Sequence, residues 1–184
     1  MIKSKDDLKH YLETDKNVYG IIRKYPRLCG DEIWKFQIAL RKEEYYYNQR
    51  GVYNKVMMKC WRQIRKYYGL MLGFDIPICT FGPGLKINHF GLIVVNDRAR
   101  IGAYCDIHQG VNIGMDGFDL DNVPTIGDNV WIGPGAKLFG KISIANNIAI
   151  GANAVVNKSF LEDNITIAGV PARKVSDKGN IYAK

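Results

Sequence analysis

The sequence predicts a mainly β protein, in which an N-terminal α-helical region precedes a parallel β-helix of short repeats. Two patterns predict it: apolar residues keep helical spacing up to about residue 73, and beyond that point a branched aliphatic residue recurs every six positions. Charge divides the 184 residues at the same place, because residues 1–74 hold 16 Lys or Arg against 8 Asp or Glu, whereas residues 75–184 hold 10 of each. We therefore expect a helical region over 1–73, a β-helix domain over 74–175 and a tail over 176–184.

The composition excludes several classes of protein. Apolar residues make up 47% of the chain and charged residues 24%, which is enough to form a core and excludes wholesale disorder. The longest uncharged apolar stretch, residues 67–74, is far shorter than the roughly 20 residues of a membrane-spanning helix. The start of the chain lacks the apolar core of a signal peptide, so we expect a cytoplasmic protein without an integral membrane segment. The cysteine spacing fits neither a zinc site nor a disulfide framework, and it predicts reduced, mostly buried thiols at Cys29, Cys60, Cys79 and Cys105.

The net charge of +8 belongs entirely to the helical region. A basic flank can attract nucleic acid, anionic lipid or a phosphorylated substrate. Here the cations alternate with acids along predicted helices, and no nucleic-acid motif accompanies them. We therefore interpret them as solvated helix faces and expect no nucleic-acid partner.

Three helices are predicted in the first region. Ser4 can cap a helix over residues 5–16, Asp31 and Glu32 open a second pattern that runs to residue 48, and a third covers residues 52–72. Each of the last two carries an apolar stripe that predicts a packing surface. The stripes are Ile33, Phe36, Leu40 and Tyr47 in the second helix, and Val56, Met57, Cys60, Trp61, Ile64 and Tyr68 in the third. The charged residues Lys35, Arg41, Lys42, Glu43 and Glu44 are expected largely on other faces of the second helix.

The six-residue repeat defines the second region. Its aliphatic positions are Val95, Ile101, Ile107, Ile113, Ile126, Ile132, Leu138, Ile144, Ile150 and Val156. A period of six fits neither a helix nor an isolated strand, because it requires a corner after each short strand. Three strands and three corners close a triangular coil of 18 residues, and the aliphatic side chains then stack inside it at about 4.8 Å per coil.

Small residues mark the corners of this coil. Glycine often follows the aliphatic residue, at Gly102, Gly114, Gly127, Gly133 and Gly151. We expect such glycines, with Asn129, Asn147, Asn153 and Asn157, to serve corners that need a positive φ. The helical region should cap one end of the column, and residues 169–173 mark the other. Between Ile113 and Ile126 the repeat is interrupted by an acidic insert, residues 115–121, which must form a loop beyond the two histidines of the repeats.

Three segments carry a resemblance to a known family: residues 87–95, which include His89, residues 126–136, and residues 168–173. Together they resemble the left-handed β-helix acyltransferases of the hexapeptide-repeat superfamily, and most closely the serine acetyltransferase branch, over residues 74–175. The resemblance implies a left-handed parallel β-helix of hexapeptide repeats and acetyl-CoA as co-substrate without a metal. It also implies a homotrimer, which could pair into a dimer of trimers, with active sites between neighbouring prisms.

The resemblance places His89 on the general base of the family and Asp75 on the aspartate that partners it, with one residue fewer between them. An imidazole, with a pKa of about 6.5, is the side chain best matched to accept a hydroxyl proton near neutrality. A carboxylate on its far nitrogen would fix the tautomer and stabilise the imidazolium. The backbone N–H of Gly114, where the chain enters the loop, is our candidate oxyanion donor. A packed structural histidine remains the alternative for His89.

The resemblance also suggests a slot for coenzyme A along the coil edge. The candidate cofactor-binding residues are Gly133, Ala136, Gly151 and Ala152 along the slot, and Lys158, Arg173 and Lys174 at its phosphate end. A glycine in this repeat is more often a corner, and a terminal cation is more often simply solvated. His108 should point outward one coil beyond His89, where it could bind the acceptor, bind coenzyme A or make a hydrogen bond between subunits.

The match fails where the family holds its amino-acid acceptor. Asn88 stands in place of an aspartate, and Asn122 and Val123 stand in place of an Arg-His pair, so a carboxylate-binding cation is missing. The acidic loop, with Asp116, would suit hydroxyl-rich ligands. We therefore expect an acetyl-CoA-dependent O-acetyltransferase whose acceptor is a sugar of a surface polysaccharide or its precursor. The alternatives are a serine O-acetyltransferase of cysteine biosynthesis and a non-catalytic hexapeptide-repeat scaffold.

Overall fold

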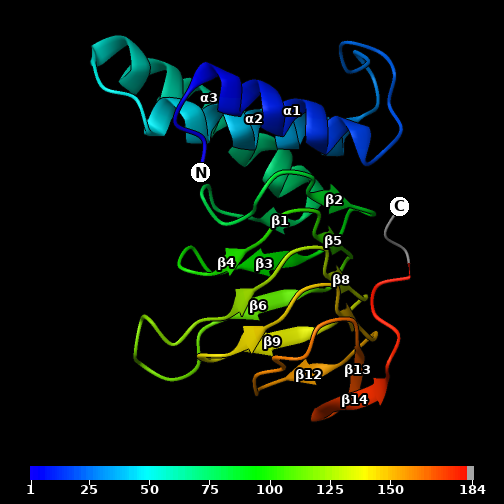
Figure 1. Cartoon of the computed structure of the whole chain (residues 1–184). Coiled ribbons are helices and arrows are strands. Elements are labelled where there is room, and N and C mark those ends of the chain that lie inside the picture. Colours follow the sequence, from blue (N-terminus) through cyan, green and yellow to red (C-terminus); the bar gives the residue numbers. More distant parts are fainter. Residues whose placement is uncertain (182–184) are drawn as a thin grey trace.

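Three helices cover one end of a column of short strands (Figure 1). The computed structural model describes residues 1–181, so residues 182–184 of the expected tail lie outside the described residues. The helices are α1 (Lys5–Asn17), α2 (Glu32–Tyr47) and α3 (Val52–Leu72). Ser4 caps α1 as predicted: its side chain accepts from the backbone N–H of Asp7, and the Asp7 carboxylate accepts from that of Ser4.

The strands form three sheets, one for each side of the column. The first sheet contains β1 (Phe74–Asp75), β3 (Ile93–Val95), β6 (Asn112–Gly114), β9 (Lys137–Phe139) and β12 (Val155–Val156). The second contains β4 (Arg100–Ile101), β7 (Thr125–Ile126) and β10 (Ser143–Ile144). The third contains β2 (Lys86–Ile87), β5 (Asp106–Ile107), β8 (Trp131–Ile132), β11 (Ala149–Ile150), β13 (Thr166–Gly169) and β14 (Ala172–Ser176). All of these pairings are parallel except β13 with β14, where the chain reverses at the end of the column.

The aliphatic repeat forms the interior of the column, as predicted. All ten of its members are buried, and Ile101, the most exposed of them, is only 4% exposed. Residues one coil apart stack in register, as Ile107, Ile132 and Ile150 do in the third sheet. The column begins one coil before the repeat becomes regular in the sequence, because Ile87 already pairs with Ile107. The predicted β-helix after a helical region is therefore confirmed.

The prediction for the corners is only half right. Asn129, Asn147 and Asn153 do adopt positive φ, but Asn157 does not. The glycines after the aliphatic residues do not either, and at all of them except Gly114 the role is steric. A Cβ on Gly102 would lie 2.7 Å from the carbonyl carbon of Gly127, so the side chain is absent where neighbouring coils touch. The left-handed asparagines also stack, because the side-chain amide of Asn129 donates to that of Asn147 at 2.8 Å.

The charged residues of α2 are not on a solvated face, which corrects that prediction. Arg41, Glu43 and Glu44 are each 1% exposed, whereas Tyr47 of the expected packing stripe is 56% exposed. Each buried charge has partners. Glu43 pairs with Arg62 and Arg65 of α3, and Glu44 accepts hydrogen bonds from the backbone of Ile2 and Cys79. These polar contacts join the helices to one another and to the first coil.

The apolar stripe of α3 is mostly not covered within this chain. Val56, Cys60 and Ile64 are exposed, and only Gly69 and Leu72 of the helix are buried. All four cysteines are free, as predicted, but the prediction that they are mostly buried is wrong, because only Cys105 is fully buried. Among the described residues, no helix combines the length and apolarity needed to cross a membrane.

Candidate functional site

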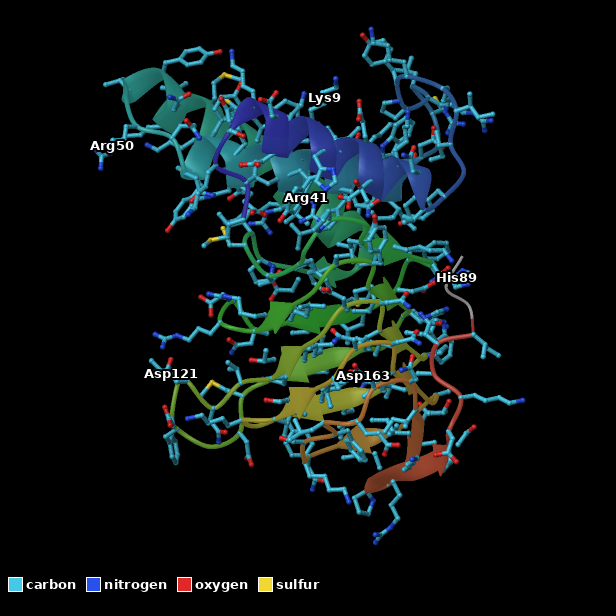
Figure 2. The ribbon with its side chains drawn as sticks, viewed as in Figure 1. Lys9, Arg41, Arg50, His89, Asp121 and Asp163 are labelled. Atoms are coloured by element: carbon cyan, nitrogen blue, oxygen red, sulfur yellow. The ribbon has the colours of Figure 1, made fainter. Side chains whose placement is uncertain are left out.

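His89 lies at a corner of the prism, between β2 of the third sheet and β3 of the first (Figure 2). Its side chain is exposed rather than packed inside the column. The corner is held against the end of α3, because the backbone N–H of Gly91 donates to the carbonyl of Leu72 at 2.8 Å. Gly91 has a φ of 131°, and a Cβ there would lie 3.0 Å from the Cβ of Gln109. Glycine is therefore required to bring the His89 corner this close to the next coil.

His108 lies one coil further along, directly after β5. The centroids of the His89 and His108 rings are 6.4 Å apart, so the two imidazoles form a pair at one edge of the third sheet. The Nδ1 of His108 lies 3.1 Å from the carbonyl oxygen of Ile132, and the ring meets the indole of Trp131 edge-on at 4.9 Å between centroids. His108 is thus held on two sides, whereas His89 is open to solvent.

Asp106 is a buried carboxylate beside this pair, and the sequence did not predict it as a site residue. It is 8% exposed and accepts hydrogen bonds from Lys86 Nζ, at 2.9 Å, and from Asn88 Nδ2. Its Oδ1 is also 3.7 Å from the Nδ1 of His108. Lys86 and Asp106 could have been found by extending the coil register back to Ile87, because the residue before each aliphatic then lies beside its counterpart one coil away.

A hollow of about 710 Å³ opens next to Lys86 and Asp106, between the carboxyl end of α1 and the third sheet. Its wall includes Tyr19, whose hydroxyl accepts from the backbone N–H of Ile87 at 2.7 Å. Burial raises the pKa of this phenol. The volume is in the range of small-molecule sites.

Asp75, the expected partner of His89, lies on β1 of the first sheet, which borders the His89 corner. Its side chain is exposed, beside Val94. Within residues 1–181, no hydrogen bond or ion pair joins Asp75 to His89. The dyad therefore stays a prediction from the family motif.

Gly114, the expected oxyanion donor, lies in β6 of the first sheet opposite Phe139, at the point where the chain enters the loop. A Cβ at this position would meet only the side-chain oxygen of Asn112, at 3.0 Å. The first sheet lies on another side of the prism from His108, so Gly114 also stays a prediction.

The expected coenzyme A residues follow the third sheet beyond His108. Gly133 and Gly151 come directly after Ile132 and Ile150, as His108 comes after Ile107, so the three positions are in line. Their N–H groups are used by the coil, because they donate to the carbonyls of Ile150 and Ile167 at 2.8 Å each.

The two alanines of this set differ in exposure. Ala152 is exposed, but the side chain of Ala136 is fully buried in the core. The main chain of Ala136 is also engaged, since its carbonyl accepts from Asn112 and its N–H donates to Gly133. Any contact of Ala136 with a ligand would therefore need the coil edge to open.

The three expected phosphate-binding cations differ in whether a carboxylate already pairs with them. Arg173 is exposed at the end of the third sheet, opposite Ala168. Lys158 is exposed, with its Nζ 5.4 Å from the ring of Phe160. Lys174 is held by Asp177 at 2.5 Å and Glu162 at 2.6 Å, and hydrogen bonds to these two carboxylates raise its pKa. Arg173 and Lys158 are thus freer to meet a phosphate.

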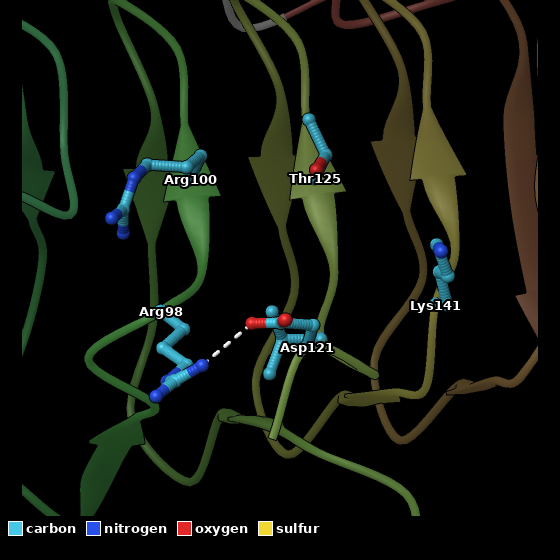
Figure 3. Close-up of a pocket in the computed structure, with 6 residues that line it drawn as sticks. Arg98, Arg100, Asp121, Thr125 and Lys141 are labelled. Atoms are coloured by element: carbon cyan, nitrogen blue, oxygen red, sulfur yellow. Dashed lines mark hydrogen bonds and ion pairs between the residues drawn. The ribbon is translucent and has the colours of Figure 1, made fainter. Parts of the chain in front are cut away.

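The acidic loop leaves the prism on another side. The Asn122 side chain donates to the carbonyl of Asp116 at 2.6 Å and so closes the loop, while Asp121 pairs with Arg98 at 2.6 Å. This pair borders an open hollow of about 470 Å³ over the second sheet, and Figure 3 shows its charged lining. The lining residues are Arg98, Arg100, Asp121, Val123, Thr125 and Lys141. One chain therefore does not bring the loop and the imidazoles to the same side. Within residues 1–181, no group of three or more His, Cys, Asp or Glu side chains gathers as a metal site.

Curated relatives match nearly the whole chain. A serine acetyltransferase of Staphylococcus epidermidis is 31% identical over 187 aligned residues, which cover 99% of this chain and 82% of the relative. A serine acetyltransferase of Staphylococcus aureus is 32% identical over 182 residues, covering 96% of this chain and 79% of the relative. No protein-family model matches the chain.

Solved structures agree in fold. The serine acetyltransferase of Brucella abortus in complex with coenzyme A is 28% identical, with a TM-score of 0.73, over 95% of this chain and 70% of that one. The serine acetyltransferase of Neisseria gonorrhoeae in complex with serine is 25% identical, with a TM-score of 0.70, over 94% of this chain and 71% of that one.

Proposed function

The chain belongs to the serine acetyltransferase family of hexapeptide-repeat transferases, and on that premise we propose that His89 is the base with which it acetylates the hydroxyl of an acceptor. As a member of this family it is an acetyl-CoA-dependent acetyltransferase rather than a scaffold. The observation that carries the proposal is an exposed imidazole at a prism corner, with a second imidazole 6.4 Å away between ring centroids.

The proposed reaction is a direct transfer. His89 takes the proton of the acceptor hydroxyl as its oxygen attacks the thioester carbonyl, and the Gly114 N–H is the proposed donor to the resulting oxyanion. The tetrahedral intermediate then collapses with cleavage of the carbon–sulfur bond, and the imidazolium returns its proton to the leaving thiolate. A positioned base of this kind contributes about 10²- to 10⁴-fold in rate. Asp75 would stabilise the imidazolium if it reaches His89 in the assembled protein.

L-Serine is the acceptor that the relatives favour. Those reported above are all serine acetyltransferases, and the Neisseria gonorrhoeae structure holds serine. A sugar hydroxyl is the second candidate, because two of the three residues that replace the family's acceptor-binding charges are engaged elsewhere. Asn88 donates to Asp106, and Asn122 closes the acidic loop. An amino acid needs another pair of groups to bind its two charges, whereas a sugar does not.

Assembly is part of the proposal. The acidic loop leaves one prism on another side than the imidazoles, so we propose a homotrimer in which a neighbouring copy brings its loop to the His89 edge. Light scattering after size-exclusion chromatography should give the mass of three chains. A monomer with full activity would contradict this assembly.

The deciding experiment is a thiol-release assay with acetyl-CoA and a panel of L-serine, amino sugars and glycosides. Turnover with L-serine alone would assign the chain to serine acetylation, turnover with a glycoside alone would assign it to sugar acetylation, and turnover with neither would overturn the proposal. His89→Ala should keep the fold and coenzyme A binding but lose at least 10²-fold in turnover. The matched control is His10→Ala, on the exposed face of α1. Unchanged turnover in His89→Ala would remove this residue from the mechanism.

A further inference from the structure

We infer that His108 binds the acceptor through its Nε2 and that the buried carboxylate of Asp106 is the positioning residue that holds it. The inference rests on the proposed function and adds the second contact that would align the reacting hydroxyl with His89. Neither Asp106 nor its partner Lys86 belongs to the residues that the family motif places at the site.

The tautomer of His108 follows from its contacts. The carbonyl oxygen of Ile132, 3.1 Å from Nδ1, can only accept a hydrogen bond, so Nδ1 must carry the proton. In the neutral ring, Nε2 then has the free lone pair. Within residues 1–181, Nε2 has no hydrogen-bond partner. This nitrogen is therefore an acceptor that is available to a ligand.

Asp106 is held firmly enough to act as a positioning group. It comes two residues before His108, with the inward-pointing Ile107 between them, so both side chains leave the outer face of the column. Lys86 and Asn88 from the neighbouring coil donate to its two oxygens, which satisfies a carboxylate that is 8% exposed. Its Oδ1 lies 3.7 Å from the Nδ1 of His108, on the protonated side of the ring. The negative charge of Asp106 therefore favours the tautomer whose N–H faces it.

Trp131 and Gly133 fix the ring from the adjacent coil. The indole meets His108 edge-on at 4.9 Å between centroids. It can lie against the sheet because position 133 lacks a side chain: a Cβ there would be 2.8 Å from the indole Cζ3 and 2.7 Å from the carbonyl oxygen of Ile150. The ring of His108 is therefore held by a carbonyl, a carboxylate and an indole, which is more support than an incidental surface histidine receives.

The two histidines differ in a way that assigns separate roles. His89 is exposed, and within residues 1–181 its ring nitrogens have no hydrogen-bond partner, so they are open to a reacting hydroxyl. His108 is held in one orientation and presents an acceptor. The ligand it fits is an acceptor molecule with a hydrogen-bond donor next to the reacting hydroxyl, such as the ammonium of an amino acid or a vicinal hydroxyl. Both candidate acceptors meet this requirement, and a comparison of analogues separates them.

The kinetic experiment uses the intact protein with the acceptor that the thiol-release assay identifies. His108→Leu should raise the KM for that acceptor at least tenfold and change the KM for acetyl-CoA less than twofold, while His108→Gln restores part of the loss. An analogue without the neighbouring donor, such as 3-hydroxypropanoate for L-serine, should bind the wild type and His108→Leu alike. An unchanged acceptor KM in His108→Leu would overturn the binding role.

The positioning role has a readout that does not depend on turnover. Nitrogen NMR of the imidazoles in the resting wild-type protein should show the Nδ1–H tautomer for His108, and added acceptor should shift its Nε2 signal. Asp106→Asn should shift the His108 nitrogen signals without unfolding the protein, because it removes the charge beside the Nδ1–H while the Ile132 carbonyl keeps the tautomer. His10→Gln should leave the His108 signals unchanged. A pure Nε2–H tautomer in the wild type, or an unaltered signal in Asp106→Asn, would overturn the assignment. Loss of turnover in His89→Ala tests the proposed function separately, so the two can fail independently.

Discussion

Arg41 of α2 and Asp15 of α1 form an ion pair 2.7 Å long in which neither side chain is more than 2% exposed. The guanidinium also donates to the carbonyls of Phe81 and Gly82, and the carboxylate accepts from the N–H groups of Gly84 and Leu85. This pair thus replaces the strand partners that the first coil lacks at its open end. The two buried charges and the unpaired backbone groups of the first coil therefore satisfy one another's hydrogen bonds.

Replacing Arg41 with methionine should destabilise the protein strongly. The substitution leaves Asp15 buried without its cation, which costs about 3–5 kcal/mol in comparable cases. Urea unfolding of Arg41→Met should show this loss, and the double variant Arg41→Met, Asp15→Leu should recover part of it.

The control for this series is Arg50→Met, at an exposed position outside the helices. It should change the free energy of unfolding by less than about 0.5 kcal/mol. If Arg41→Met were as mild, the ion pair would not be what anchors the helices to the column.

The column could be predicted from sequence because each coil repeats the same constraint. An aliphatic residue such as Ile132 must point inward in every coil, so the period is visible without any knowledge of distant contacts. Arg41 shows the opposite case. Its hydrogen-bond partners lie 26 or more positions away along the chain, and periodicity assigns a charged residue to the surface unless those partners are known.

The residues of the candidate site also differ in whether a local sequence pattern could predict them. His89 could be identified because a short local motif surrounds it, and His108 because it is one coil away. Asp106 was missed because its role depends on the register between two coils, and the first of them lacks the regular repeat. Asp75 illustrates the converse: a motif suggests a pairing with His89, while no hydrogen bond or ion pair joins the two side chains within residues 1–181.

Substitution of the repeat glycines should show whether crowding between neighbouring coils excludes a side chain after the aliphatic residue. Gly102→Ala should destabilise the protein by about 1–3 kcal/mol, because the new Cβ would lie 2.7 Å from the main chain of Gly127 in the next coil. Gly114→Ala is the matched comparison at the same repeat position, where the only close atom is a movable oxygen of Asn112 at 3.0 Å. It should cost clearly less in thermal or urea unfolding. Equal losses would mean that coil spacing is not what excludes a side chain after the aliphatic residue.

The rate at which each of the four cysteines reacts with a thiol reagent should follow its exposure. Cys29 and Cys60 are exposed and should react quickly with a chromogenic disulfide reagent, whereas Cys79 is half-buried and should react slowly. Cys105 should react only after denaturation, because it is fully buried and burial raises the pKa of its thiol, which suppresses the reactive thiolate. Cys105→Ala should lower the count by one in denaturant and leave the count in buffer unchanged. Rapid reaction of Cys105 in the native protein would contradict a closed column, and slow reaction of Cys60 would mean that another surface covers this side of α3.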